Sequence, residues 1–285
     1  MSRRILVLGA TGMLGQPVTH CLAERGNSVR VLVRNREKAR QMFGDEIEVI
    51  AGDALKRENI QAAMAGCEAV HLNLPQISEL TAMQHITDVG KANGLERVTY
   101  ISATTVCEAN RWYDLVEVKM RTEHILRSSG IANTIFCPTW AMETLPNFIR
   151  GNRAVVIVSK NPPPLHFLAA ADLGRMVAAS YEDRRALGRR LFVHGPESMT
   201  LPDAFRRFVR ACYPGKKITQ MKLWQAQWLA KLTGREELTE ATQLIAYFDK
   251  VGELGDPAEA NVLFGAPSIT LDEWCRMQEP AHKVG

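Results

Sequence analysis

The sequence predicts an α/β fold: a Rossmann-type, doubly wound parallel sheet with a smaller, mostly helical C-terminal lobe. Three observations predict it. Short apolar runs rich in β-branched residues alternate with amphipathic helical patterns, a glycine-rich turn follows the first run, and the alternation weakens beyond residue 138. Strands that alternate with helices at this spacing form βαβ units, and the strands of such units lie parallel in one sheet.

The pattern places the elements as follows. Strands are expected at residues 5–8, 29–33, 47–50, 69–72, 98–101 and 133–136, with helices at 16–24, 37–42, 57–64, 78–92 and 115–128. Later helices are expected at 171–182, 201–211, 223–232, 236–250 and 271–277, interrupted by strands at 154–158 and 190–194. We therefore expect a Rossmann domain at residues 1–150 and a smaller substrate or lid lobe at 151–285, with segments that return to the main domain.

Composition and charge exclude several classes of protein. The 285 residues carry a net charge of +4 without a dense basic stripe, so no nucleic-acid partner is expected. Apolar runs stay well short of the roughly 18 residues of a membrane helix, so we expect no membrane contact and a cytoplasmic location. The six cysteines are widely spaced, and no Cys/His spacing suits zinc. Neither a disulfide framework nor a metal site is expected.

A glycine-rich loop follows the first expected strand. Its spacing, Gly9-x-x-Gly12-x-x-Gly15, lies between a strand and a helix, which is the context of a dinucleotide-binding loop. Gly9 and Gly12 allow a tight turn and a close approach of pyrophosphate to the backbone, and the helix N-terminus supplies unpaired N–H groups. The residues assigned to cofactor binding here are Gly9, Thr11, Gly12, Met13, Leu14 and Gly15.

The end of the second strand indicates which dinucleotide binds. An NAD site usually has a carboxylate there for the ribose 2′-hydroxyl, whereas this chain has Arg34, whose guanidinium suits a 2′-phosphate. We therefore expect NADP (NADPH). Asp53 follows the third strand, where its carboxylate either accepts from the adenine amino group or caps the following helix. Further cofactor contacts are assigned to Ala54, Asn73 and Pro138.

Several motifs together resemble the atypical short-chain dehydrogenase/reductase group, in its NmrA-like and isoflavone-reductase-like branch. They are the loop 9–15, Arg34, Gly52-Asp53, Lys119-x-x-x-Glu123 with residues 129–131, and the segments 138–140, 167–174 and 195–200. The resemblance covers about residues 3–210. It implies an NADP-binding Rossmann fold but does not specify a substrate. The isoflavone-reductase-like members use a lysine equivalent to Lys119 without a partner tyrosine, and NmrA-like members include redox-responsive regulators.

The catalytic motif of most short-chain reductases is incomplete in this chain. Their Tyr-x-x-x-Lys places a proton-donating tyrosine four residues before a lysine that lowers the pKa of that tyrosine. Here Leu115 stands four residues before Lys119, while Ser102 occupies the expected serine position after the fifth strand. Tyr113 precedes Lys119 by six residues, about 120° away on a continuous helix. It can substitute only if the helix begins after it and the loop folds back.

Lys119 belongs to a helix face that is otherwise mostly apolar. Leu115, Lys119, Thr122 and Leu126 follow the spacing of one face. A desolvated lysine there would hold the ribose or act as an acid through a lowered pKa. The alternative is a lysine at the edge of this face that pairs with Glu123 four residues later. The family resemblance favours the functional role.

These observations lead to two functional hypotheses. The first is an NADPH-dependent reductase, monomeric or homodimeric, that transfers hydride to a small apolar carbonyl, quinone or enone. Its catalytic residues would be Lys119, Ser102 and Tyr113. The second is a non-catalytic NADP(H)-binding redox sensor, regulator or assembly factor, which the missing tyrosine favours. A nucleotide-sugar epimerase is disfavoured, since that chemistry depends on the tyrosine.

The remaining candidates carry less information about function. An apolar substrate pocket would have aromatic and methionine walls, for which the sequence offers Trp112, Trp140, Met142 and Phe148. Such residues are more often part of an ordinary core. His166 precedes the segment 167–174 and could face a cleft, although a lone histidine is usually structural.

Overall fold

A computed structural model describes residues 2–278, and in it the chain divides into two compact units. The first unit contains the chain up to Pro138 together with Ala170–Val193 and Asp256–Ala266. The second contains Thr139–Ala169, His194–Gly255 and the described residues from Pro267 to Gln278. The first continuous stretch thus ends at Pro138 rather than near residue 150, and two later segments return to the first unit.

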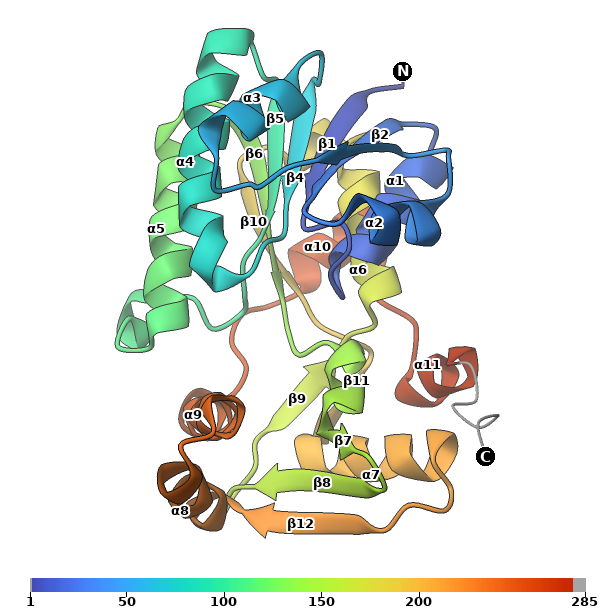
Figure 1. Ribbon diagram of the computed structural model, residues 1–285, viewed down its shortest axis with the longest axis vertical. Helices are drawn as coiled ribbons and strands as arrows, with labels where there is room; N and C mark the ends of the chain where they lie inside the picture. Colours follow the sequence, from blue (N-terminus) through green and yellow to red (C-terminus); the bar gives the residue numbers. More distant parts are fainter. Residues whose placement is uncertain (1, 279–285) are drawn as a thin grey trace. The chain divides into compact units, whose positions relative to one another are not determined.

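A seven-stranded parallel sheet forms the centre of the first unit (Figure 1). Its strands are β1 (Arg4–Leu8), β2 (Ser28–Val33), β3 (Glu48–Ala51), β4 (Ala69–Leu72), β5 (Arg97–Ile101), β6 (Ala132–Pro138) and β10 (Arg189–Val193). They lie in the order β10-β6-β5-β4-β1-β2-β3, so the direction of winding reverses between β1 and β4. The fold is therefore the predicted doubly wound parallel sheet. The predicted strand at 190–194 is the edge strand of this sheet.

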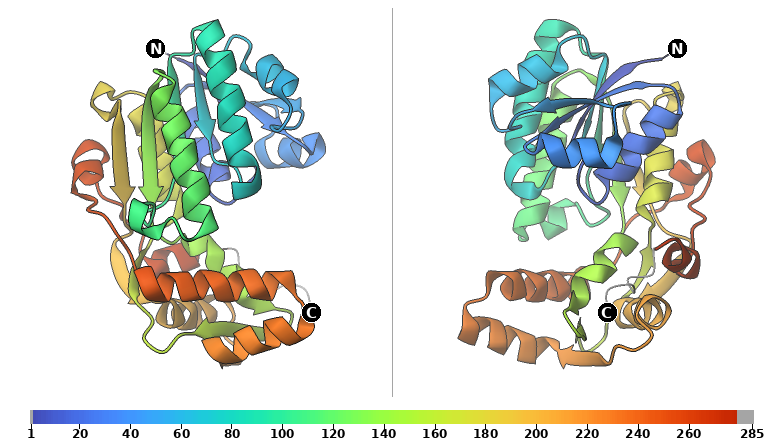
Figure 2. Two further views of the ribbon diagram at one scale, coloured as in Figure 1. Left: turned by 90° about the vertical axis from the view of Figure 1, so that its left-hand side faces the viewer. Right: turned by 45° about the vertical axis from the view of Figure 1, so that its right-hand side comes forward.

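Helices cover both faces of this sheet (Figures 1 and 2). The helices α3 (Arg57–Met64), α4 (Gln76–Asn93) and α5 (Asp114–Ser128) lie on one face, and α1 (Gly15–Glu24), α2 (Arg36–Phe43), α6 (Ala170–Ser180) and α10 (Ala258–Phe264) lie on the other. Local sequence signals set several boundaries. The Asn35 side chain caps α2 by accepting from the Lys38 N–H at 2.9 Å, and α4 ends at left-handed Gly94.

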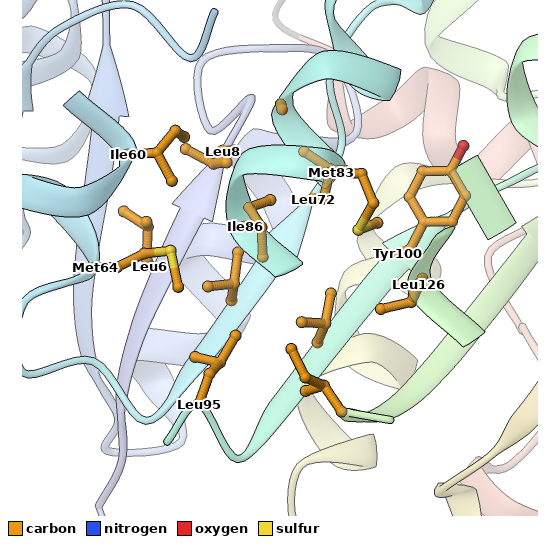
Figure 3. Close-up of a cluster of buried hydrophobic side chains, with 14 of the residues drawn as sticks. Leu6, Leu8, Ile60, Met64, Leu72, Met83, Ile86, Leu95, Tyr100 and Leu126 are labelled. Atoms are coloured by element: carbon orange, nitrogen blue, oxygen red, sulfur yellow. The ribbon is translucent and has the colours of Figure 1, made fainter. Parts of the chain in front are cut away.

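The core beneath α3, α4 and α5 buries one face of the central sheet (Figure 3). Strand side chains meet helix side chains there and are removed almost completely from water, as shown by Leu6, Leu8, Ile60, Met64, Leu72, Met83, Ile86, Leu95, Tyr100 and Leu126. Burying each large apolar side chain contributes about 1.5–3 kcal/mol, so this layer is a main source of the unit's stability.

The second unit combines helices with short strands. Its helices are α7 (Leu201–Cys212), α8 (Leu223–Thr233), α9 (Glu236–Val251) and α11 (Leu271–Met277). One sheet contains β7 (Ile149–Arg150), β8 (Arg153–Val158) and β12 (Ile218–Lys222), and another pairs β9 (Pro164–Phe167) with β11 (Glu197–Thr200). The sequence did not predict β11 and β12, which are short, partly exposed and too polar to form an apolar run. Among the described residues no helix is both long and apolar enough to cross a membrane.

A buried histidine lies in the centre of the first unit's sheet. His71 on β4 is fully buried, and its Nδ1 lies 2.8 Å from the Thr99 hydroxyl, which in turn lies 2.7 Å from the Tyr181 hydroxyl. Its Nε2 has no hydrogen-bond partner among the described residues. Burial lowers the pKa of His71 from 6.5 to about 3, because the low-dielectric core disfavours the charged imidazolium.

His71 is expected to make the protein sensitive to acid. A depressed folded-state pKa contributes stability that is present above pH 6.5 and is lost as the pH falls from 6.5 toward 3. Between pH 6.5 and about pH 5 this loss amounts to about 2 kcal/mol. Urea unfolding at both pH values should show a smaller loss in His71→Leu than in the wild type, whereas exposed His124→Gln should retain the wild-type loss. Equal pH dependence in His71→Leu and the wild type would contradict this assignment.

Candidate functional site

The first unit gathers the predicted site residues along one edge of its sheet. Because all seven strands are parallel, their carboxyl ends meet at the same edge. Each of five strands is followed there by a predicted residue, in the spatial order Asp53, Arg34, Gly9, Asn73 and Ser102. The reversal between β1 and β4 lies at the middle of this row. In open α/β sheets, ligands bind at this reversal, outside the carboxyl ends of the strands.

The glycine loop is shaped by contacts that leave no room for side chains. Gly9 has φ +86°, and a Cβ built on it would lie 1.8 Å from the Asn73 carbonyl oxygen. A Cβ on Gly15 would lie 2.0 Å from the Gly9 carbonyl oxygen, which also accepts a 3.0 Å hydrogen bond from Gly12 N–H. Helix α1 begins at Gly15 without a side-chain cap from Leu14. Bare backbone and uncapped N–H groups therefore meet at the head of α1.

The other loop residues lie around this backbone. Met13 is exposed, whereas Thr11 and Leu14 are half-buried. Pro138 is buried at the end of β6, where its carbonyl accepts from Thr104 N–H at 3.2 Å. Pro138 therefore offers its backbone, and not its side chain, at the carboxyl edge of the sheet.

Arg34 and Asp53 follow neighbouring strands. Arg34 is exposed and has no hydrogen bond or ion pair with any described residue. Asp53 is held in a turn: its Oδ1 accepts from Leu55 N–H at 3.0 Å, and its own N–H donates to the Asn59 side chain at 2.8 Å. The N-cap of α3 is Lys56, so the suggestion that Asp53 caps this helix is wrong. Ala54, within the same turn, is half-buried.

Lys119 is fixed at the carboxyl end of β5. Its Nζ donates to the Ile101 carbonyl and to Glu79 Oε2, both at 3.1 Å, and lies 5.3 Å from the centre of the Tyr100 ring. Only 12% of the Lys119 side chain and 1% of the Glu79 side chain are exposed. The pairing with Glu123 that the sequence offered as an alternative is therefore wrong, since Lys119 pairs with Glu79 on α4.

Glu79 is held in a low-dielectric environment. Burial raises the pKa of the Glu79 carboxyl, and the nearby Lys119 ammonium counteracts this by lowering it. Because two charges are removed from water together, loss of either partner leaves an uncompensated charge in the interior. One sequence signal could have identified Glu79: it is an acidic residue on a helix face that otherwise continues with the apolar Met83 and Ile86.

Ser102 belongs to a different network. Its hydroxyl donates to Glu123 Oε1 at 2.5 Å, and Glu123 Oε2 pairs with Arg190 Nε at 3.1 Å. Ser102 is 3% exposed. The structure thus places Ser102 after β5 as predicted, but its hydroxyl is committed to a buried carboxylate. Arg190 was not recognised from the sequence, because only the pairing of β10 with β6 brings it to this position.

Tyr113 lies immediately before α5. It is the N-cap residue of that helix, with φ −101° and ψ 120°, and it is half-buried. The helix therefore begins after Tyr113, which meets the first of the two conditions under which Tyr113 could substitute for the missing tyrosine. Leu115 follows in the first turn, so no tyrosine precedes Lys119 by one helical turn.

The apolar residues proposed as pocket walls are divided between the units. Trp140 belongs to the second unit and lines a small, open hollow there with Phe248, Ile157, Leu165 and Ile245. Met142, with no exposed surface, belongs to that unit's core, and Phe148 packs against it. Trp112 lies in the first unit and is 51% exposed.

Two curated proteins illustrate what this chain is similar to. It is 30% identical over 142 residues to a photosystem II assembly factor of Cyanophora paradoxa, covering 46% of this chain and 44% of that protein. It is 27% identical over 198 residues to the (4-alkanoyl-5-oxo-2,5-dihydrofuran-3-yl)methyl phosphate reductase of Streptomyces griseus, covering 69% of each. The alignment thus spans less than half the length of the first relative.

Comparison with solved structures and with protein families extends these similarities to the whole chain. An NADPH-dependent quinone oxidoreductase from Escherichia coli, solved in complex with NADPH, has a TM-score of 0.76 at 22% identity, covering 95% of this chain and 98% of that one. This similarity shows the shared fold. The model of the NmrA-like family matches residues 1–275. With the Gly9–Gly15 loop at the reversal of a doubly wound sheet, this match shows that the chain belongs to the NmrA-like family.

Proposed function

We propose that this protein binds NADPH and transfers its hydride to a small apolar carbonyl, quinone or enone. The observation that carries the proposal is the bare backbone at the head of α1, where Gly12 is exposed and where side chains on Gly9 or Gly15 would collide with the backbone that shapes the loop. A pyrophosphate fits this position because the uncapped N–H groups and the positive end of the helix dipole favour an anion. Thr11, Gly12, Met13 and Leu14 would supply the surrounding contacts.

Arg34 supports NADPH over NADH. Its guanidinium follows β2 directly, is exposed and has no acidic partner among the described residues. A dinucleotide seated at the reversal between β1 and β4 would place its adenosine ribose beside the end of β2. Arg34 would then bind the 2′-phosphate through parallel N–H donors. Asp53, Ala54 and Asn73 would flank the remaining nucleotide.

Lys119 would act at the other end of the cofactor. Two of its three N–H donors are used by Ile101 and Glu79, which leaves the third for a ligand at the carboxyl edge of β5. This donor would hold the nicotinamide ribose and assist proton supply to the reduced substrate, while Pro138 would support the ring through backbone contact. NADPH, when bound, would supply the hydride. Tyr113 would serve as a further hydrogen-bond donor, and Ser102 would do so only by releasing Glu123, to which its hydroxyl donates.

The relatives are compatible with a reductase of this kind. The Streptomyces griseus protein is named as a reductase of a phosphorylated dihydrofuranone, and the Escherichia coli structure is named as a quinone oxidoreductase. Both names describe reduction of a conjugated carbonyl system. A substrate of the same class would suit a protein that offers a positioned ammonium group.

A second candidate function is a non-catalytic NADP(H)-binding sensor or assembly factor. Two observations favour it: the Ser102 hydroxyl is committed to Glu123, and Leu115 occupies the position of the usual tyrosine. The Cyanophora paradoxa relative is named as an assembly factor.

Turnover distinguishes the two functions. Purified protein would be mixed with NADPH and a panel of quinones, aldehydes and enones while the absorbance of the reduced nicotinamide is followed. Tight NADPH binding without any turnover would overturn the reductase hypothesis and favour the non-catalytic sensor or assembly factor.

Replacing Arg34 tests the assignment of the cofactor. We expect Arg34→Ala to weaken NADPH binding about 10- to 100-fold, since a hydrogen bond to a charged group contributes about 1.5–3 kcal/mol, and to leave NADH binding nearly unchanged. Exposed Arg184 lies before β10, at the opposite end of the strands, so Arg184→Ala is a matched control. Fluorescence titration of both cofactors measures these affinities. Equal losses for NADPH and NADH would refute the role of Arg34.

A further inference from the structure

Three potential metal ligands converge in the second unit, although none belongs to a sequence motif for metal binding. His166 lies on β9, His194 follows β10 directly, and Glu253 follows the Gly252 turn that ends α9. Glu253 Oε1 lies 2.5 Å from His166 Nδ1 and 3.2 Å from His194 Nδ1. The two imidazole rings are stacked with centroids 5.4 Å apart. One potential ligand atom from each of the three residues lies within 4.8 Å of those of the other two.

The hydrogen bond on the far side of His194 fixes its tautomer. His194 Nε2 lies 3.2 Å from the Leu254 carbonyl oxygen, and because a carbonyl only accepts, Nε2 carries the proton. In the neutral imidazole, Nδ1 then presents a lone pair toward the Glu253 carboxylate. Two lone pairs facing each other at 3.2 Å require a positive species between or beside them. An N–H bonded to a backbone carbonyl is also the usual outer contact of a metal-binding histidine.

The Glu253 carboxylate is held in a fixed orientation. Its Oε2 accepts from the His166 backbone N–H at 2.8 Å and from the Thr139 hydroxyl. These contacts leave Oε1 directed at the two histidines. Only 9% of the Glu253 and His194 side chains is exposed, compared with 39% of the His166 side chain. The cluster is therefore a preorganised carboxylate–histidine pair with a second, more accessible histidine.

We propose that His166, His194 and Glu253 bind a divalent transition metal ion of the zinc type. Two imidazole nitrogens and one carboxylate oxygen form a ligand set that zinc accepts, with bond lengths of about 2.0–2.2 Å. Tetrahedral zinc separates its donor atoms by roughly 3.3 Å, which the His194–Glu253 distance of 3.2 Å already matches. The shorter His166–Glu253 distance must open by roughly 1 Å, and the accessible His166 ring can make that movement. The fourth position is left for water or an exogenous ligand.

Zinc binding by the full-length protein tests this proposal. Metal-free protein would be titrated with zinc chloride in competition with a chromophoric chelator, and the bound zinc counted by elemental analysis after gel filtration. We expect one zinc ion per chain and a higher unfolding temperature in its presence. His194→Ala and Glu253→Gln should abolish stoichiometric binding, and Thr139→Val, which removes an outer contact, should weaken it about 10-fold. Cobalt should give a visible absorption band typical of tetrahedral coordination.

The controls separate this site from other zinc-binding groups. His124 is exposed and outside the cluster, so His124→Ala should bind zinc like the wild type. His166→Ala, at the most accessible ligand, provides a ligand variant that retains the buried His194–Glu253 pair if His194→Ala fails to fold. Absence of stoichiometric binding by the wild type would overturn the proposal, and the cluster would then share only protons. Binding that survives in both His166→Ala and Glu253→Gln would also overturn it by assigning the zinc to other groups, such as the free cysteines.

Discussion

Lys119→Ala is expected to lower NADPH-dependent turnover about 10²- to 10⁴-fold, the usual contribution of a positioned proton-transfer group. The same substitution is expected to destabilise the fold by about 3–5 kcal/mol, because it leaves Glu79 buried without its partner. Glu79 is 1% exposed, so water cannot replace the lost ammonium without opening the core. Turnover is measured by oxidation of NADPH with the best substrate of the panel, and stability by urea unfolding.

Two further variants separate catalysis from folding. In Lys119→Ala/Glu79→Gln both the ammonium and the buried carboxylate are absent. Most of the lost stability should therefore return while turnover stays low. Exposed Lys91 on α4 is the matched control, and Lys91→Ala should change neither quantity. Wild-type turnover in the double variant would remove Lys119 from the mechanism. If stability did not recover, the destabilisation would not arise from the unpaired Glu79.

The pH dependence of Lys119→Ala has a definite sign. Burial raises the pKa of Glu79, and loss of Lys119 removes the nearby charge that lowers it. A carboxyl whose folded-state pKa lies above its ordinary value of 4.5 is most compatible with the folded state when protonated. The variant's stability, relative to the double variant, should therefore be lost as the pH rises from 4.5 through the folded-state pKa of Glu79.

Alanine at Gly15 is expected to cost at least about 3 kcal/mol of stability and to eliminate NADPH binding. The Cβ would lie 2.0 Å from the Gly9 carbonyl oxygen, and because the Cβ is fixed by its own backbone and meets a backbone atom, neither can move without displacing β1 or α1. Gly9→Ala should be at least as severe, since its φ of +86° adds backbone strain to a 1.8 Å contact with Asn73. Urea unfolding and NADPH titration measure the two effects.

Gly26→Ala isolates the contribution of the backbone conformation. Gly26 has φ +76°, but a Cβ on it would have nothing within 4 Å. Only the strain of a left-handed conformation remains, about 1–2 kcal/mol, and NADPH binding should persist. If Gly26→Ala and Gly15→Ala were equally destabilising, the close contact inside the glycine loop would not be what determines its shape.

Several predictions that rested on local patterns are confirmed, whereas two others, the Asp53 cap of α3 and the Lys119–Glu123 pair, are wrong. Alternating strands and helices predicted the doubly wound sheet, and residues 69–72 form β4 with the predicted bounds. The family resemblance rested on short motifs and is confirmed by the match over residues 1–275. The glycine loop was recognisable because its geometry depends on neighbours close in sequence. Asn73, which limits the space at Gly9, enters only through the pairing of β4 with β1.

The features that sequence patterns missed depend on contacts between distant residues. Lys119 and Glu79 are 40 residues apart and meet through the packing of α5 against α4. The i,i+4 spacing offered Glu123 as an alternative partner, yet that carboxylate is taken by Ser102 and Arg190. The residues at 190–194 read correctly as a strand, but their place in the first sheet depends on pairing with β6. Periodicity carries no information about such partners.

The interleaving of the two units has a consequence for biosynthesis. A chain that leaves the ribosome from its N-terminus exposes β1 to β6 early, but the sheet lacks its edge strand until Val193 has emerged. Phe264, whose ring lies 6.1 Å from that of Phe136, arrives later still on α10. Until then β6 offers an unpaired edge, the kind of surface on which nascent chains aggregate. The N-terminal unit is thus completed only when α10 has been translated, and a truncation before residue 193 leaves that edge permanently open.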